Sequence, residues 1–377
     1  MQLTPIEFAS RTRLVFGNGV SKQVGELTQA LGAKRVLLVT DAGIVAAGHA
    51  ARVQTYLQNA GLRVTVFDRA RENPTTQCVA DCVAAAQAAE IDGLIGLGGG
   101  SSMDTAKGCN FILTNGGRMQ DYWGVGKATK PMLPFVAIPT TAGTGSEMQC
   151  AALIADEVSH QKMACLDPKC AARIAILDPE LTVSQPPRVT ACTGIDAIAH
   201  AVETAVTTKR TELSQRLSRE AFQLCVTAFP QVLATPSDLT ARAAMQLGAA
   251  YAGAAIENSM LGAAHAAANP LTAHFGIVHG HAVGLMLPAV VRWNAQDAAA
   301  RAGYEFLTGQ NGVAALPEKL QALLQLTGLP LTLTAAGVNR NALPTLAAEA
   351  ARQWTASFNP RPLTAADFVQ LYEAAFA

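Results

Sequence analysis

The chain has 377 residues, of which 50% are hydrophobic and 15% charged, and its 28 basic residues balance its 28 acidic residues. A chain of this length and apolarity can bury a large interior and suggests two domains, which excludes an intrinsically disordered protein. Because the charges balance, no net field favours nucleic acid or an anionic membrane, and we expect neither as a partner.

Targeting signals are not evident. The first residues, "MQLTPIEFASRTRLVF", lack a basic segment followed by a long apolar one, so we expect no signal peptide. The apolar run "AVGLMLPAVV" ends at Arg292 and is too short to cross a membrane. The 8 cysteines lie in apolar segments without paired CxxC spacing. We therefore expect reduced core cysteines in a cytoplasmic protein.

The first half of the chain alternates β-rich runs with helical patterns. The predicted strands are residues 35–40, 63–68, 93–100, 134–141 and 173–178, and helical patterns cover 42–59 and 81–91. This alternation, with apolar strands, is typical of a parallel sheet covered by helices on both faces. We predict an α/β domain over residues 1–185 that binds a dinucleotide.

The character of the sequence changes near residues 185–187. Beyond this point alanine and leucine dominate, and long patterns of period 3.6 appear, as in "ELSQRLSREAFQLCVTAF". No convincing strand follows. We predict an all-helical domain over residues 186–377.

Two glycine-rich segments follow predicted strands. "GLGGGSSMDTAK" (Gly96–Lys107) opens a helix whose N–H groups and dipole suit a pyrophosphate, although Ser101 replaces the third glycine of the usual G-x-G-x-x-G motif. "IPTTAGTGSE" (Ile138–Glu147) offers hydroxyls and glycines to a phosphate or ribose. Either segment alone could be a tight turn without a ligand. Together, at the carboxyl ends of strands in one sheet, they predict a nucleotide site.

Asp41 ends the first predicted strand. A carboxylate there can accept hydrogen bonds from ribose hydroxyls and would repel a 2′-phosphate. The alternative is a helix cap or turn residue.

Four of the 7 histidines fall between residues 263 and 281. Such a cluster could be a metal site, a proton relay or a set of satisfied core residues. Among the four histidines, His265 and His279 are separated by Pro270 and Gly276, which could bend the chain around one centre.

A partner for this cluster lies in "TGIDAIAHAVE". Asp196 and His200 are four residues apart and share one helical face. The alternative is an N-cap at Thr193 with Asp196 in the first turn and a packed His200. Combined with the downstream histidines, a carboxylate and imidazoles predict a Zn²⁺ or Fe²⁺ site with an open position for a substrate oxygen.

The chain resembles the iron-containing (group III) alcohol dehydrogenases, the family of lactaldehyde reductase and 1,3-propanediol dehydrogenase. The segments "LVFGNG", "NPT", "GGGSSMDTAK", "PTTAGTGSE", "GIDAIAHAVE", the histidine segment and "NPRP" occur in family order over nearly the whole length. The resemblance implies a Rossmann-like N-terminal domain, a helical C-terminal domain, and a homodimer or larger homo-oligomer.

The resemblance also implies site residues. The metal ligands would be Asp196, His200, His265 and His279. The pyrophosphate would be held by Gly98, Gly99, Gly100, Ser101, Ser102 and Asp104. The remaining cofactor contacts would come from Thr140, Thr141, Thr144, Ser146, Asn73 and Lys162, with Asp41 at the position where an acidic residue goes with NAD. His274 and His281 are not ligands in the family pattern and are expected to be surface or structural residues.

One position departs from the family. Members commonly carry a second histidine four residues after the first, close to the nicotinamide, and this chain has Asn269 there. Asparagine can hydrogen-bond but cannot titrate near neutral pH, which puts the family's histidine relay in doubt. Asn269 is a candidate catalytic position; the alternative is that it hydrogen-bonds the nicotinamide amide or caps the helix before Pro270.

The reaction implied is hydride transfer between NAD(H) and a small alcohol or aldehyde, with a divalent metal, Fe²⁺ in preference to Zn²⁺. Two alternatives stay open. A sugar-phosphate lyase of the dehydroquinate-synthase type would need a basic phosphate pocket, and no Lys/Arg cluster accompanies the ligands. A catalytically silent nucleotide- or metal-binding protein would show no turnover.

Overall fold

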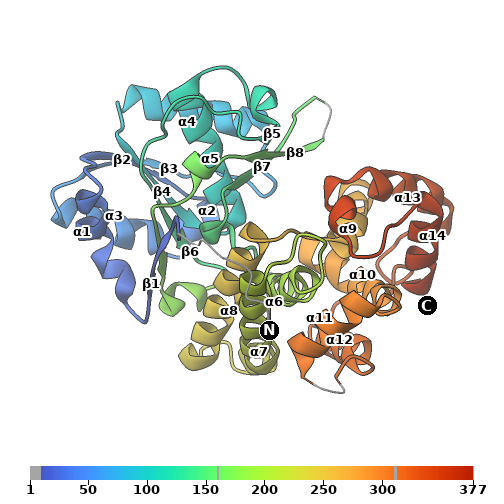
Figure 1. Ribbon diagram of the computed structural model, residues 1–377. Coiled ribbons are helices and arrows are strands. Elements are labelled where there is room, and N and C mark those ends of the chain that lie inside the picture. The colour runs from blue at the N-terminus through green and yellow to red at the C-terminus, as the bar shows by residue number, and fades with distance from the viewer. Residues whose placement is uncertain (1–9, 159–160, 310–311, 377) are drawn as a thin grey trace. The chain divides into compact units, whose positions relative to one another are not determined.

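The computed structural model describes residues 10–158, 161–309 and 312–376, which form two compact units (Figure 1). The first unit comprises the chain up to Thr140 together with Ser146–Asp178. The second comprises Thr141–Gly145 and the chain from Pro179 onward. The predicted boundary at residues 185–186 lies within the second unit, between the 3₁₀ helix η5 (Pro179–Thr182) and helix α6 (Pro187–Thr204).

A six-stranded sheet is the framework of the first unit, and every pair of neighbouring strands in it is parallel. In spatial order the strands are β1 (Arg13–Phe16), β9 (Ile174–Leu177), β6 (Phe135–Pro139), β4 (Gly93–Gly98), β2 (Arg35–Val39) and β3 (Arg63–Phe67). The predicted parallel α/β fold is confirmed. The edge strand β1 was not among the predicted strands.

The helices of the first unit connect these strands. They are α1 (Val24–Ala30), α2 (Ala42–Ala46), α3 (His49–Asn59), α4 (Thr76–Ala88) and α5 (Gly100–Asn115). The helical pattern predicted over 42–59 is divided at Gly48, whose φ of 80° lies in the left-handed region that glycine adopts without strain. Helix α5 packs on β4 and α4. A Cβ on Gly96 would lie 3.2 Å from the Cα of Met103, so this glycine allows the close approach of α5 to β4.

The strand order reverses beside β2. From β2 the chain passes to β3 on one side and then returns to β4 on the other side, after which β6 and β9 follow outward. At such a switch point the connections leave the sheet in opposite directions, and ligands of open α/β sheets bind at the carboxyl ends of the strands there. Asp41 follows β2 and Gly98 ends β4, so both lie at this position.

A second, small sheet contains β5 (Gly124–Val125), β8 (Lys162–Leu166) and β7 (Ala151–Ala155), with β7 and β8 antiparallel. It was not predicted. The sequence "AALIA" is short and rich in alanine, which has low β-propensity, and "KMACL" is short and lacks alternation of apolar and polar residues, so no local pattern marks them as strands.

The second unit is helical. Its helices are α6, α7 (Glu212–Ala234), α8 (Leu239–Glu257), α9 (Ala263–Phe275), α10 (His279–Asn294), α11 (Ala298–Thr308), α12 (Leu316–Gln325), α13 (Leu343–Arg352) and α14 (Ala365–Ala374). Residues 179–309 and 312–376 include no strand, which confirms the all-helical prediction. Many alanines in its core allow helices to approach closely. In the described part of the chain, no helix combines the length and apolarity needed to cross a membrane.

Candidate metal centre and nucleotide loops

Helix α6 presents polar side chains from one buried face. Asp196, His200 and Glu203 follow each other at helical spacing and are 5%, 4% and 3% exposed. The helix begins at Pro187, so Thr193 lies inside it, where its Oγ1 donates to the carbonyl of Val189 at 2.8 Å. The alternative of an N-cap at Thr193 is therefore wrong.

Helices α9 and α10 supply the other histidines. His265 lies in the first turn of α9, and His279 is the first residue of α10. Pro270 lies inside α9 without ending it, whereas Gly276, with a φ of 63°, ends the helix and turns the chain. A Cβ on Gly280 would lie 2.0 Å from the carbonyl oxygen of Cys192. The absence of a side chain at Gly280 thus lets the start of α10 rest on α6 beside Asp196.

These segments converge on one carboxylate oxygen. Oδ1 of Asp196 lies 3.4 Å from Nε2 of His265, 3.6 Å from Nε2 of His200 and 4.0 Å from Nε2 of His279. Ligand atoms of Asp196, His265 and His279 all lie within 4.8 Å of one another. The ring of His200 stacks on that of His265, with centroids 4.8 Å apart. The structure brings all four predicted ligands together, with His200 beside the group of three.

Hydrogen bonds at Nδ1 fix the orientation of two of the imidazoles, those of His200 and His265. Nδ1 of His200 lies 3.2 Å from the carbonyl oxygen of Gly143. A carbonyl only accepts, so Nδ1 carries the proton and the lone pair of Nε2 faces Asp196. Nδ1 of His265 lies 2.5 Å from Oε2 of Glu203, which orients that ring in the same sense. Metal-binding histidines in proteins are commonly held this way.

The charges of the cluster are strongly coupled. Burial opposes ionisation of Asp196, but the facing imidazoles outweigh it and lower the pKa of this carboxyl. Burial likewise disfavours a charged His265, yet the carboxylates of Glu203 and Asp196 raise its pKa to about 9. Burial lowers the pKa of His200. One positive charge on His265 thus faces two carboxylates, an arrangement that a divalent cation could replace.

The donor set fits such a cation. Oδ1 of Asp196 and Nε2 of His265 are buried and, among the described residues, have no hydrogen-bond partner. Leaving polar atoms in this state is costly, and native proteins rarely do so without a ligand, ion or water. A carboxylate with imidazoles suits Fe²⁺ or Zn²⁺. The His279 side chain, at 29% exposed, gives the site one accessible side.

The other two histidines of α9 and α10 point elsewhere. Nε2 of His274 pairs with Oε2 of Glu349 at 2.9 Å, on an exposed surface. Nε2 of His281 lies 2.7 Å from the carbonyl oxygen of Pro330 and donates to it. Both therefore have surface or structural contacts, as the sequence predicted.

Asn269 lies on α9, one turn beyond His265 on the same face. It is inside the helix, so its alternative interpretation as a cap is wrong. The side chain is half-buried, and its Nδ2 donates to Oε1 of Gln353 at 3.0 Å.

In the first unit, Asp41 and the first predicted nucleotide loop meet at the switch point of the sheet. Oδ1 of Asp41 caps α2 by accepting from the N–H of Ile44 at 3.0 Å. Its Oδ2 lies 3.3 Å from Oγ of Ser102, in the first turn of α5. A Cβ on Gly98, whose φ is 146°, would lie 2.5 Å from that same Oγ, so glycine is required there. Asp41 is therefore a helix cap that also contacts the glycine-rich turn.

The other predicted cofactor residues lie in several places of the two units. Nζ of Lys162 lies 3.4 Å from Oδ1 of Asn73, and both are exposed. Asp104 is buried and accepts from Oγ of Ser146 at 2.9 Å, which ties α5 to the second loop. Gly99 is the N-cap of α5, Gly100 and Ser101 are in its first turn, and Thr140 follows β6. Thr141 and Thr144 belong to the second unit.

Sequence reasoning missed Lys107 and Glu203. Lys107 is fully buried, and its Nζ donates to carbonyl oxygens of Ser146, Gln149 and Ala151 and to Oγ of Ser146, at 2.6–2.9 Å. It therefore fixes the segment after the second loop. Glu203 stands in the quoted motif "GIDAIAHAVE", at helical spacing from Asp196, and that spacing was the signal that could have identified it.

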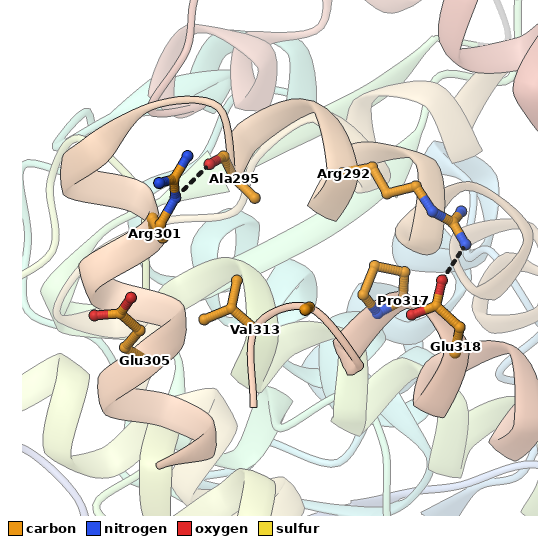
Figure 2. A pocket seen from close by; sticks show the side chains of 8 residues that line it. Arg292, Ala295, Arg301, Glu305, Val313, Pro317 and Glu318 are labelled. Carbon is orange, nitrogen blue, oxygen red and sulfur yellow. Dashed lines mark hydrogen bonds and ion pairs between the residues drawn. The ribbon is translucent and has the colours of Figure 1, made fainter. Parts of the chain in front are cut away.

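A separate hollow lies on the second unit, far in sequence from the ligands of α6. Figure 2 shows its lining by side chains of α10, α11 and α12, including Arg292, Arg301, Glu305 and Glu318. Its volume is about 630 Å³. The two arginines are engaged, Arg292 with Glu318 at 3.0 Å and Arg301 with the carbonyl of Ala295 at 3.0 Å. None of the predicted metal ligands lines it.

Comparison with known families gives two matches that together cover most of the chain. Residues 11–179 match the family described as iron-containing alcohol dehydrogenase. Residues 190–376 match the C-terminal part of the Fe-containing alcohol dehydrogenase family.

Individual relatives and a solved structure are similar to this chain over nearly its whole length. The chain is 34% identical to the NAD-dependent methanol dehydrogenase of Bacillus methanolicus, over 96% of this chain and 97% of that one. It is 32% identical to the lactaldehyde reductase of Escherichia coli, over 96% and 97% of the two chains. Among solved structures, a 1,3-propanediol oxidoreductase superposes with a TM-score of 0.95 at 30% identity, covering 99% of this chain and 100% of that one.

Proposed function

The chain belongs to the iron-containing alcohol dehydrogenase family, and from this premise we propose that it transfers a hydride between NAD(H) and a small alcohol or aldehyde at a divalent metal centre. The single observation that carries the proposal is the convergence of Asp196, His265 and His279, in which Oδ1 of Asp196 and Nε2 of His265 are buried and lack hydrogen-bond partners among the described residues. Neither the sugar-phosphate lyase nor the silent binding protein is favoured by an observation of its own.

We propose that the second unit holds the metal and the substrate. Asp196, His200, His265 and His279 would be the ligands, with Fe²⁺ preferred to Zn²⁺ on the family's description. A cation held there supplies Lewis acidity toward the oxygen of the alcohol or aldehyde. The chain's part is to keep the donors dry and oriented: Gly143 and Glu203 hold two of the imidazoles with Nε2 toward Asp196.

We propose that the first unit binds the dinucleotide. Bound NAD supplies the hydride carrier. The N-terminus of α5 and the glycine-rich turn Gly98–Ser102 would bind the pyrophosphate through N–H groups. Asp41 would accept from the ribose and disfavour a 2′-phosphate, as expected for a relative of an enzyme named as NAD-dependent.

Further cofactor contacts would come from residues on either side of this turn. The exposed pair Asn73 and Lys162 offers an amide and an ammonium. Thr140, Thr141, Thr144 and Ser146 would line the cofactor, and Asp104 would act through Ser146. These assignments rest on the sequence motifs and on the contacts within each unit.

Asn269 bears on proton transfer. Its amide cannot accept and release a proton near neutral pH. We propose that no side chain at this position relays the proton, and that Asn269 keeps its Nδ2–H on Oε1 of Gln353. Proton release would then pass through water or a ribose hydroxyl.

We also propose a cytoplasmic location and a homodimer or larger homo-oligomer. All 8 cysteines are free thiols and most are buried, which supports a reducing compartment. The family resemblance supports the proposed oligomeric state.

The test combines metal analysis with turnover. Protein purified without air should contain close to one Fe²⁺ or Zn²⁺ per chain and should oxidise NADH with a small aldehyde. His279→Ala should lose most of the metal and the turnover. His274→Ala, which removes an exposed imidazole of α9, is the matched control and should retain both. Full turnover by a His279→Ala protein shown to be free of metal would overturn the proposal.

A further inference from the structure

Glu203 is a buried carboxylate to which the family resemblance assigned no role. It lies at the C-terminal end of α6 and is 3% exposed. Its two oxygens have different partners: Oε2 lies 2.5 Å from Nδ1 of His265, and Oε1 accepts from the N–H of Ala264 at 2.7 Å. Both partners lie in the first turn of α9.

We propose that Glu203 is the positioning residue of the metal centre: it fixes His265 with the proton on Nδ1 and Nε2 toward Asp196, and it anchors the start of α9 to α6. This inference rests on the proposed function, because it assigns a role toward the proposed metal.

The partners require a carboxylate. Two donors, the N–H of Ala264 and the N–H of the imidazole, point at one side chain, and only a carboxylate offers an acceptor to each. A glutamine has one carbonyl oxygen, so it can satisfy one donor while its amide N–H₂ faces the other. If it kept the bond to Ala264, Nδ1 of His265 would accept from the amide, and the proton of a neutral ring would move to Nε2, the atom that faces Asp196.

The packing leaves no room for adjustment. A Cβ on Gly262 would lie 3.1 Å from Oε1 of Glu203 and 3.0 Å from Oδ1 of Asn359. Oδ1 of Asn359 accepts from the N–H of Ala263 at 3.3 Å. The first two N–H groups of α9 therefore donate to two buried side chains, those of Asn359 and Glu203. The first N–H groups of a helix have no partner within the helix and favour a negative charge, which suits a carboxylate here.

The balance of charges in the metal centre also favours a carboxylate at position 203. Asp196 and Glu203 carry two carboxylates within one dry cluster of neutral or singly charged imidazoles. A divalent cation beside Asp196, with neutral histidines, would be balanced by these two groups. Removing the charge of Glu203 would leave the cation undercompensated in a region of low dielectric.

The substitution Glu203→Gln tests the role, and the probes are Zn²⁺ and Co²⁺. Removing a side chain that orients a metal-bound histidine lowers metal affinity by roughly 10–100-fold. We expect a loss of this size in a chelator competition. The metal-loaded wild-type protein should show an exchange-protected imidazole proton on Nδ1 of His265 by ¹⁵N-resolved NMR, and the variant should lose it. The visible spectrum of bound Co²⁺ should change as well.

Asn359→Ala is the matched control. It removes a contact to the same end of α9 without touching His265. We expect it to lower the midpoint of thermal unfolding while the Nδ1 proton and the Co²⁺ spectrum stay as in the wild type.

The outcomes separate the two proposals. Failure of the wild-type protein to bind either ion overturns the metal centre and the role of Glu203 with it. Equal affinity of wild type and Glu203→Gln, with the Nδ1 proton retained, overturns the role of Glu203 alone. Loss of affinity in Asn359→Ala equal to that in Glu203→Gln would show that only the folding of the α9 start matters, and this also overturns it.

Discussion

Glu147 should make the first unit less stable at neutral pH than at mildly acidic pH. The residue lies in the 3₁₀ helix η3 (Ser146–Met148) and is 2% exposed. Burial raises the pKa of this carboxyl to about 7, even though its own backbone N–H and the nearby Lys107 favour the ionised form.

The sign follows from proton binding. Between pH 4.5, the ordinary pKa of a glutamate, and about 7 the folded chain holds a proton that the unfolded chain has lost. Stability therefore falls as pH rises through this window and stays lower above it. A shift of this size corresponds to about 3 kcal/mol in the free energy of unfolding. Because the side chain is fully buried, solvent does not screen the effect.

The assay compares Glu147→Gln with the wild-type protein by thermal unfolding at pH 5 and pH 8. Glutamine keeps the shape and cannot ionise, so the variant should gain up to about 3 kcal/mol relative to wild type between the two pH values. For a unit of this size, that is roughly 6–12 °C in Tm. Any packing change caused by the amide acts equally at both pH values and cancels in the difference.

Glu157→Gln is the control, because Glu157 is an exposed carboxylate of the same unit. Its pH dependence should match that of the wild type. If Glu147→Gln and wild type keep a constant difference in Tm from pH 5 to pH 8, the buried carboxyl is not protonated in the folded chain and the reasoning fails.

Three further results are expected. Gly280→Ala should lower the free energy of unfolding by about 1–3 kcal/mol and reduce metal occupancy, because its Cβ would lie 2.0 Å from the carbonyl oxygen of Cys192. Denaturant unfolding combined with metal analysis measures both effects, and wild-type values would contradict the packing argument. Asp41→Gly should improve kcat/KM with NADPH by on the order of 10-fold, through relief of about 1.4 kcal/mol of repulsion, and a wild type that already prefers NADPH would show the assignment to be wrong. Asn269→His should add or shift an apparent pKa of kcat/KM in the roughly 6–8 range without removing the metal; a profile of unchanged shape between pH 5 and 10 would count against the proposal for this position.

The sequence by itself determined the fold class. Strand-forming runs alternate with helical patterns up to residue 178, and period-3.6 patterns alone follow. These signals are local, because a strand or helix with one or two buried faces must repeat its apolar residues at a fixed spacing. The same local logic found Asp196 and His200, since four residues bring two side chains to one face of a helix.

Where local patterns are weak, the sequence did not suffice. The strand β7 is alanine-rich, β8 lacks alternation of apolar and polar residues, and no motif marks the two as an antiparallel pair. The single helical pattern predicted over residues 42–59 was also wrong at position 48, because the pattern continues on both sides of it. Only the left-handed backbone of Gly48 shows the break between α2 and α3.

The arrangement of the candidate site was decided by tertiary structure. Glu203 reaches His265 across 62 positions of the chain, and Gly280 rests on the carbonyl of Cys192. Inside the first unit, Nζ of Lys107 donates to carbonyls some 40 positions away in the chain. A buried charge or close approach is tolerated only where distant segments supply a partner or leave space, and a single sequence does not state which segments meet. The residue types of the metal centre were therefore visible in the sequence, whereas the groups that hold them in place became visible only in the folded chain.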